Sequence, residues 1–427
     1  PEVSVARILA GYESGHMKGV VVVHNAGARE RRIAVRFDPG WFNPDWFDPR
    51  WSGPGGFDPH SPDPGGSGPG RFEPGRIDGV AAGRRRPEPA DSERRQPGDL
   101  LNDVTGPETS TPGALKPQAP RLESEIAVPA GQTAAVPFSF PASAEFLWTP
   151  ERPRTFEATA ELSDAETSET IDIWREHYGL ADVAVAGTQI LFGGEPLFIK
   201  GVNWHADDPE VGAALGPEHL RRDFELMLAA GANLVRFSHY PRHPEAYRLA
   251  DRLGLLVMDE APNYWMDRAG LLHQLEDGLS ATYVRSMVWN HMNHPSVILW
   301  SVLNESETGV RGGRAARDFL AEMAGSVRAL DLSHRPVTYA SNHLRDDVGF
   351  DLVDVIGINE YFGFFYGAHH DLGPLLDFLH LRYPDKPVLI TEFGDWAVYG
   401  TGRETTQAFT FREHWRQMVE RSRFVAG

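Results

Sequence analysis

Residues 297–305 have the sequence Val-Ile-Leu-Trp-Ser-Val-Leu-Asn-Glu, a buried-strand pattern that ends in two polar residues. Six similar apolar runs occur between residues 197 and 390, and amphipathic helical patterns such as 218–230, 244–253 and 314–330 separate them. Continuous apolar strands that alternate with helices are typical of a parallel sheet covered on both faces. Seven such units within about 230 residues favour a (β/α)8 barrel over an open sheet. The runs are 197–203, 234–237, 255–258, 297–302, 336–339, 355–358 and 388–390.

The eighth strand is the incomplete part of this barrel. Residues 423–427 have the character of its beginning, and the sequence stops there. Because a barrel of seven strands leaves two open edges, which invite aggregation, we expect further sequence beyond Gly427. No glycine-rich phosphate loop follows the first strand, which disfavours nucleotide binding.

The N-terminal part has a different pattern. Residues 2–37 and 122–172 alternate between apolar and polar side chains, with turn signals between short strands. We therefore predict a β-sandwich built from residues 1–37 and 122–185, followed by the barrel over 186–427. Ala26-Gly27-Ala28 separates two strand patterns and predicts a hairpin.

Residues 38–121 separate the two halves of the predicted sandwich. This segment holds 16 of the 33 prolines, and proline recurs every five residues from 54 to 74. Such a composition buries too little apolar surface to offset the entropy of ordering. We predict a disordered insertion with pentapeptide repeats, placed in a loop of the sandwich.

Charge and cysteine content exclude several classes of function. Asp and Glu total 60 against 41 Lys and Arg, a net charge of −19, which disfavours nucleic acid or an anionic membrane as the main partner. The absence of cysteine excludes thiolate nucleophiles, disulfides and Cys-ligated metals. No apolar run is long enough to span a membrane. We expect neither a metal nor a cofactor. The sequence does not fix the compartment, although a cytoplasmic location is slightly favoured over secretion. It does not fix the oligomeric state either, and a homo-oligomer is compatible with it.

Chemistry in a barrel of this kind belongs to the carboxyl ends of the strands. Glu305 and Glu392 follow the fourth and seventh strands, which face each other across the barrel. A retaining glycosidase uses two carboxyl groups about 5–5.5 Å apart, one as nucleophile and the other as acid and base. Asn304 is placed to bind the sugar 2-hydroxyl group, and Arg236 to keep Glu392 ionised. His291 and His294 have a spacing that suits a metal, but they precede the fourth strand and we interpret them as packing residues.

Several motifs resemble glycoside hydrolase family 2. They are Lys200-Gly201-Val202-Asn203-Trp204-His205, Val235 to Pro241, Asn293-His294-Pro295-Ser296, Leu299 to Glu305 and Ile390 to Gly394, together with Leu147 to Pro153 at the end of the predicted sandwich. The resemblance covers nearly the whole chain except 38–121. It implies an immunoglobulin-like sandwich followed by a catalytic TIM barrel that lacks most of its last strand.

The resemblance also implies roles for individual residues. Glu392 is expected to be the nucleophile, Glu305 the acid and base, and Tyr361 a hydrogen-bond partner of the nucleophile. Asn359-Glu360-Tyr361-Phe362-Gly363 is most similar to the β-glucuronidase branch. His205, Asp207 and His239 fall where the family binds sugar. Arg236, Asn304 and Asn359 are also expected at the sugar site, and Trp396, just past the nucleophile strand, either stacks on a sugar ring or packs on the barrel rim.

These observations predict a retaining exo-β-glycosidase acting on terminal β-linked sugars, either β-glucuronidase-like or β-galactosidase-like. The family's N-terminal jelly roll and the region after strand eight are absent from the sequence, which leaves the glycone open. The alternative is a catalytically impaired carbohydrate-binding or scaffold protein, since the barrel is unfinished.

Deletion of residues 40–119 tests the predicted insertion. Because the free energy of loop closure grows slowly with loop length, a short replacement loop should leave Tm and activity nearly unchanged. Calorimetry and an activity assay on the deletion variant measure both. An unfolded variant would show that the segment is structural.

Overall fold

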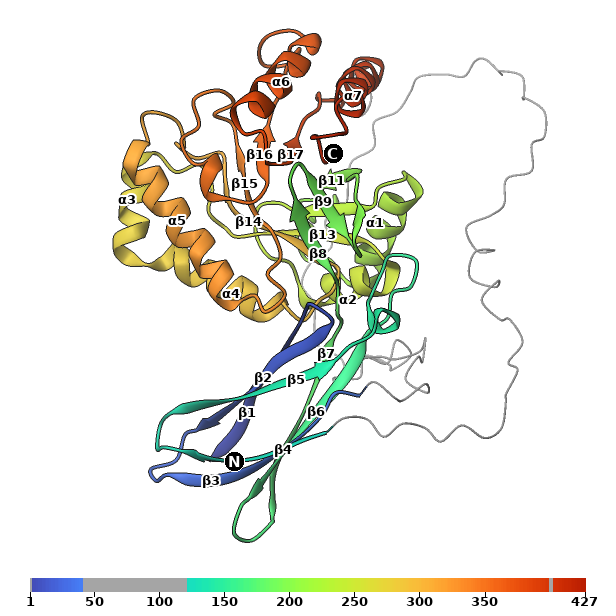
Figure 1. The fold of residues 1–427 in the computed structure, drawn as a ribbon. Coiled ribbons are helices and arrows are strands. Elements are labelled where there is room, and N and C mark those ends of the chain that lie inside the picture. Colours follow the sequence, from blue (N-terminus) through green and yellow to red (C-terminus); the bar gives the residue numbers. More distant parts are fainter. Residues whose placement is uncertain (1, 41–120, 399–401) are drawn as a thin grey trace, which may run out of the picture. The chain divides into compact units, whose positions relative to one another are not determined.

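The computed structural model describes residues 2–40, 121–398 and 402–427. Seven parallel strands pair in chain order to form one sheet, and helices lie around its outside (Figure 1). The predicted barrel is therefore confirmed for these seven strands. They are β11 (Gly201–Asn203), β12 (Leu234–Phe237), β13 (Leu256–Glu260), β14 (Val297–Asn304), β15 (Val337–Ser341), β16 (Ile356–Asn359) and β17 (Val388–Glu392). The helices are α1 (Pro217–Ala229), α2 (Pro244–Leu253), α3 (Arg268–Asp277), α4 (Leu279–His291), α5 (Gly313–Leu330), α6 (Leu372–Arg382) and α7 (Glu404–Val419), with 3-10 turns η3 (Ala144–Phe146), η4 (Phe350–Leu352) and η5 (His369–Asp371).

Local sequence signals set the limits of these helices. Helix α2 begins with Pro244 in its first turn, where the missing N–H costs no hydrogen bond, and Gly254 ends it in the left-handed conformation. Asp267 begins α3, because its carboxylate accepts a hydrogen bond from the Gly270 N–H at 2.8 Å. These signals place each helix between the strands that it connects.

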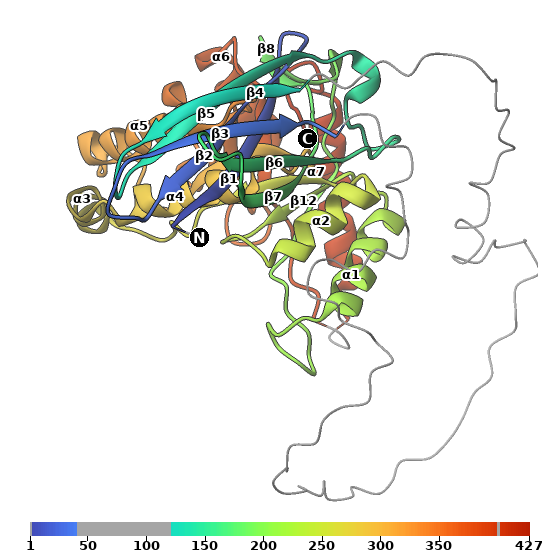
Figure 2. The ribbon, with the colours of Figure 1, turned by 90° about the horizontal axis from the view of Figure 1, so that it is seen from below.

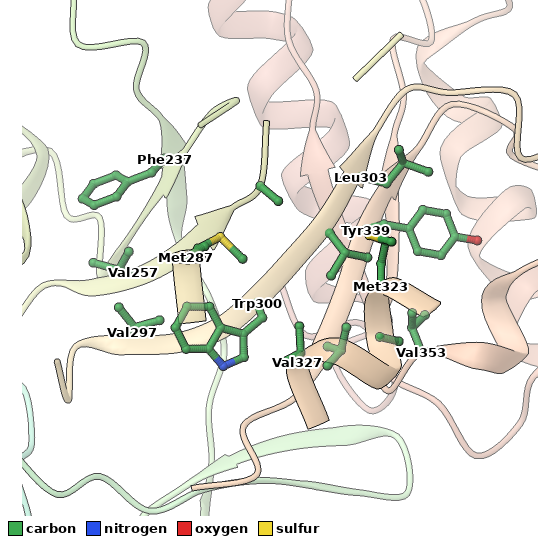
Figure 3. Close-up of a cluster of buried hydrophobic side chains, with 14 of the residues drawn as sticks. Phe237, Val257, Met287, Val297, Trp300, Leu303, Met323, Val327, Tyr339 and Val353 are labelled. Atoms are coloured by element: carbon green, nitrogen blue, oxygen red, sulfur yellow. The ribbon is translucent and has the colours of Figure 1, made fainter. Parts of the chain in front are cut away.

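The barrel core lies between the sheet and the helices that cover it. All eight residues of β14 are buried. Trp300 of this strand is fully buried among side chains from neighbouring strands and from α4 and α5, including Val257, Met287 and Val327 (Figure 3). A strand that buries both faces keeps a continuous apolar sequence, which is why β14 carries the clearest pattern in the chain.

Residues 424–427 continue the ring from β17 toward the first strand. The Val388 N–H donates to the Phe424 carbonyl at 2.9 Å, and the Ala426 N–H donates back to Val388 at 2.7 Å. On the other side, the Ile199 N–H donates to the Ala426 carbonyl at 2.7 Å. The segment expected to begin an eighth strand thus pairs with both neighbours. The expectation of two fully open edges is wrong at this level of the barrel, because these residues already occupy the gap.

Two antiparallel sheets share a second core in the N-terminal part (Figure 2). One has the order β1-β2-β5 and the other the order β4-β3-β6-β7. Their strands are β1 (Val3–Glu13), β2 (His16–Asn25), β3 (Arg31–Asp38), β4 (Leu122–Val128), β5 (Thr133–Pro141), β6 (Phe156–Asp164) and β7 (Thr170–Tyr178). This arrangement is the predicted sandwich, and its immunoglobulin-like class stays a prediction.

The hairpin predicted around residues 26–28 is wrong. Strand β2 pairs with β1 and β5, whereas β3 pairs with β4 and β6 in the other sheet. The buried Asn25 side chain organises the crossing, since its amide donates to the carbonyls of Arg29 and Val128 at 2.8 Å. Alternating patterns identify both strands, but they do not state which partner each strand takes.

The predicted domain limits stay predictions. The limit at residue 185 falls within β8 (Val183–Ala186), which pairs with β9 (Gln189–Phe192) in a small sheet completed by β10 (Glu195–Pro196). The predicted disordered insertion lies outside the described residues, apart from 38–40 and 121. None of the helices in the described ranges combines the length and apolar character that crossing a bilayer requires.

A buried ion pair fixes the amino-terminal end of β14. Arg335 donates to Asp331 at 2.7 Å, and its guanidinium lies 4.8 Å from the centre of the Trp300 ring. The indole N–H of Trp300 donates to the same Asp331 carboxylate. Burial favours the neutral carboxyl form, but the Arg335 charge outweighs it and holds the pKa of Asp331 below its ordinary value of 3.8. Arg335 also donates to backbone carbonyls of Met292, His294 and Val297.

Replacing Arg335 with Met should lower the free energy of unfolding by about 3–5 kcal/mol at neutral pH, because Asp331 becomes a buried charge without a partner. A carboxyl with a lowered folded-state pKa adds stability above its ordinary pKa, and this contribution disappears as the pH falls through the folded-state value. The difference in the free energy of unfolding between wild type and variant should therefore become smaller as the pH falls. Urea unfolding across pH measures it.

The matched control is Arg314→Met, which removes an exposed ion pair with Asp318. Its free energy of unfolding should match that of the wild type. Equal effects of the two substitutions would contradict a stabilising role for the buried pair.

Candidate active site

The carboxyl ends of the parallel strands bring polar side chains to one rim of the barrel. Arg236, Asn304, Asn359 and Glu392 each come from the last two residues of a different strand. A cavity of about 390 Å³ opens at this rim. It is lined by His239, Trp265, Asn304, Glu305, Asn342, Asn359, Tyr361, Phe365, Tyr366, Glu392 and Trp396.

Arg236 is the buried cation beneath this cavity. Its guanidinium contacts both oxygens of Glu260, at 2.9 and 2.7 Å, and donates to Glu392 at 2.5 Å. Burial opposes the charged guanidinium, yet the Glu260 and Glu392 carboxylates outweigh it and raise the pKa of Arg236. The fully buried Glu260 responds in the opposite sense: burial favours its neutral form, but Arg236 and His239 lower its pKa. The pair is therefore charged on both sides.

Glu392 is held by two donors of different chemistry. One carboxylate oxygen accepts from Arg236, and the other accepts from the Tyr361 hydroxyl at 2.7 Å. Burial and the adjacent Glu392 charge raise the pKa of Tyr361 far above its ordinary value, so the phenol stays protonated and donates. His239 lies 4.0 Å from Glu392 and hydrogen-bonds Glu260 at 2.9 Å.

Within the part of the chain that the structure describes, the Glu305 carboxylate accepts hydrogen bonds from neutral donors. Asn359 donates to one oxygen at 2.9 Å, and the Trp265 indole N–H donates to the other at 3.2 Å. The backbone of Glu305 is in the left-handed region, with φ of 41°, and its N–H donates to the Ala340 carbonyl at 2.8 Å. Such a conformation costs free energy in a residue with a Cβ atom and persists only where the surroundings enforce it.

Two amide side chains connect these carboxylates. The Asn304 side-chain oxygen accepts from Arg236 at 2.8 Å and from Asn359 at 3.1 Å. The Asn359 oxygen accepts from the Thr391 hydroxyl at 2.7 Å, which assigns its amide group to the donor side facing Glu305. One continuous network thus joins the ends of β12, β14, β16 and β17.

The structure gathers most of the predicted site residues. The cavity is lined by Glu305, Glu392, His239, Asn304, Asn359, Tyr361 and Trp396, and the buried Arg236 donates to two of them, Glu392 and Asn304. His205 and Asp207 are not among the lining residues and are exposed. The His205 ring packs edge-on against His239 with ring centres 5.3 Å apart, and burial lowers its pKa, as do the nearby charges of His239 and Arg242.

Sequence reasoning missed Glu260 and the aromatic part of the lining. Asp259 and Glu260 follow the apolar run 255–258, and charged residues in that position are a signal that was available. Trp265, Phe365 and Tyr366 lie in loops beyond the strand ends, where apolar periodicity carries no information. Asn342 follows the end of β15 and belongs to the same group of loop residues.

The described residues contain no group of three or more His, Cys, Asp or Glu side chains arranged to hold a metal ion. His291 and His294 instead hydrogen-bond the buried carboxylates of Asp259 and Asp251, at 2.7 and 2.6 Å. Both histidines therefore lie where packing residues were predicted.

Comparison with known proteins places the chain in a family. The family model described as "Glycosyl hydrolases family 2, TIM barrel domain" matches residues 183–420. A β-glucuronidase of Streptococcus agalactiae is 34% identical over 253 residues, which are 52% of this chain and 40% of that protein. The mouse β-glucuronidase is 31% identical over 290 residues, 64% of this chain and 43% of its own length. The chain therefore spans about two fifths of the length of these curated relatives.

Solved structures share the fold. A family 2 β-galacturonidase from Eisenbergiella tayi, bound to galacturonate, has a TM-score of 0.73 at 20% identity, covering 98% of this chain and 63% of its own. A β-glucuronidase from Ruminococcus gnavus has a TM-score of 0.67 at 21% identity, covering 100% and 61%. Since the family model covers more than half of the chain, this protein belongs to glycosyl hydrolase family 2.

Proposed function

We propose that the protein is a retaining exo-β-glycosidase that hydrolyses terminal β-linked sugars by double displacement. The observation that carries the proposal is the unequal environment of two carboxylates in one cavity. Glu392 contacts the buried cation Arg236, whereas the hydrogen-bond donors to Glu305 among the described residues are the neutral Asn359 and Trp265. Two carboxyl groups with different surroundings are what a nucleophile and a separate general acid require.

The proposed reaction begins with attack by Glu392 on the anomeric carbon. Glu305 transfers its proton to the leaving oxygen as the glycosidic bond breaks, and a glycosyl ester forms on Glu392. Glu305, now a carboxylate, then takes a proton from water, which attacks the same carbon and releases the sugar with its β configuration. Arg236 and Tyr361 hold Glu392 in place and share its negative charge.

The remaining predicted residues are proposed to bind the sugar. The Asn304 oxygen is occupied by Arg236 and Asn359, so its NH₂ group is the donor for a sugar hydroxyl. His239 and Trp396 line the same cavity, while His205 and Asp207 are proposed to close it from the exposed side. The relatives are named β-glucuronidases and β-galacturonidase, so aryl β-glucuronides are the first substrates to assay, followed by β-galacturonides and β-galactosides.

Replacing Glu392 with Gln should reduce kcat at least 100-fold, because the amide keeps the shape of the side chain but cannot attack carbon. Initial rates on a 4-nitrophenyl β-glycoside measure this effect. The exposed Glu276→Gln on α3 is the matched control and should keep wild-type rates. A Glu392→Gln variant with more than about 1% of wild-type activity would contradict the nucleophile role.

Replacing Glu305 with Ala should slow hydrolysis of poor leaving groups far more than that of activated aryl glycosides, which scarcely need protonation. Added azide should partly restore the rate on the activated substrate and yield a β-glycosyl azide, because it replaces the water that Glu305 activates. Rates with and without azide, and NMR of the product, test both points. An equal loss of hydrolysis rate on both kinds of substrate would contradict the role of Glu305 as acid and base.

A further inference from the structure

Trp265 combines a fixed position with an open surface. It lies in the loop between β13 and α3, and its side chain is 71% exposed. Its backbone has a left-handed φ of 54°, and its N–H donates to the Asn304 carbonyl at 3.1 Å. The next N–H, of Met266, donates to the Ser306 hydroxyl at 3.0 Å. The loop is thus tied to the residues on both sides of Glu305, although the indole surface is largely uncovered.

The hydrogen bond from Trp265 to Glu305 locates this surface within the reaction. A general acid must reach the oxygen that leaves, so the leaving group lies against the side chains around the acid. The Trp265 indole N–H donates directly to Glu305, at 3.2 Å. If Glu305 has the role given under the proposed function, on which this step rests, the exposed indole borders the leaving group.

A second group of aromatic side chains lines the same cavity. Phe365 is 58% exposed and Trp396 is 64% exposed, and their ring centres lie 5.9 Å apart. Phe365 also packs on Tyr361, the partner of Glu392, with ring centres 5.2 Å apart. The cavity therefore has an aromatic surface next to each of its two carboxylates.

The polar atoms of this aromatic lining are largely engaged within the protein. The indole N–H of Trp265 donates to Glu305. The Tyr366 hydroxyl accepts from the backbone N–H of Tyr361 at 2.9 Å, and Phe365 has no polar group. A second sugar would present hydroxyl groups that these side chains do not satisfy, and unpaired polar groups weaken binding. Flat apolar groups suit this lining better, because aromatic rings pack on one another with additional free energy.

We propose that Trp265 is the specificity-determining residue for the leaving group. Its indole ring stacks on a flat aromatic aglycone, while its indole N–H orients Glu305. The two functions belong to different parts of one side chain. Phenylalanine keeps an aromatic face and loses the N–H, whereas alanine loses both. The pair of variants therefore separates recognition of the aglycone from orientation of the acid.

The kinetic experiment compares Trp265→Phe and Trp265→Ala on phenyl and methyl β-glycosides of the same sugar. Trp265→Ala should raise KM for the phenyl glycoside about 3- to 10-fold more than for the methyl glycoside, the range that aromatic stacking supports. Trp265→Phe should keep most of the phenyl preference and lose kcat on the methyl glycoside, which needs the acid more. Trp174→Ala, an exposed tryptophan on β7, is the matched control and should change neither value.

A binding experiment separates this proposal from the proposed function. Phenyl and methyl 1-thio-β-glucuronides and 1-thio-β-galactosides resist hydrolysis, so calorimetry on them requires no turnover. Wild type should bind a phenyl thioglycoside about 3- to 10-fold more tightly than its methyl counterpart, and Trp265→Ala should remove the difference. If wild type hydrolyses no glycoside, the proposed function fails while this test still decides the role of Trp265. No phenyl preference in wild type, or its survival in Trp265→Ala, would overturn the proposal.

Discussion

One buried guanidinium organises the carboxyl end of the barrel strands. Arg236 on β12 has a side chain that is only 3% exposed, and a charge at that depth is tolerated only when partners surround it. Its donors reach Glu260, Glu392, Asn304 and the Asn203 side chain at 3.1 Å. These partners come from β13, β17, β14 and β11, so a single cation sets the relative positions of four strand ends. The Asn203 amide donates in turn to the Thr391 carbonyl at 3.1 Å, which connects the first strand to β17 above the level that residues 424–427 occupy.

The same cation creates the difference between the two cavity carboxylates. Because Glu260 binds the Nε and Nη2 side of the Arg236 guanidinium, Glu392 receives a single donor, Nη1, rather than a bidentate pair. That arrangement stabilises charge on Glu392 without covering the carboxylate, whose side chain remains 12% exposed. Glu305 lies outside this ion-pair network and contacts it through Asn359 and Asn304. The positive φ of Glu305 occurs where the chain leaves strand β14, and the hydrogen bond from the Glu305 N–H to the Ala340 carbonyl stabilises it.

The barrel and its polar rim were largely predictable, because both follow from short-range rules. Apolar runs separated by helical patterns identify the seven strands, and the polar residues within a few positions after the runs identify the rim, Glu305 and Glu392 included. Pairing in the sandwich was not predictable in the same way. Strands β2 and β3 alternate as the strands of a hairpin do, yet they belong to different sheets, and the Asn25 side chain stabilises the connection between them. Alternation indicates which face of a strand is buried, but not which strand pairs with it. The immunoglobulin-like class and the roles of the site residues remain predictions.

Apart from Glu260, the parts of the site that sequence reasoning missed belong to its outer layer. The inner layer of Arg236, Glu260 and the two asparagines is buried in the barrel and cannot change without loss of charge pairing. The aromatic side chains of Trp265 and Phe365, and of the predicted Trp396, are carried by loops that follow the strands, and their exposed faces contribute little to the core. Substitutions there alter the cavity lining while the ion-pair network stays intact. Under the proposed function, the rigid inner layer performs the chemistry and the loops around it select the leaving group, which fits a scaffold on which reaction and specificity vary independently.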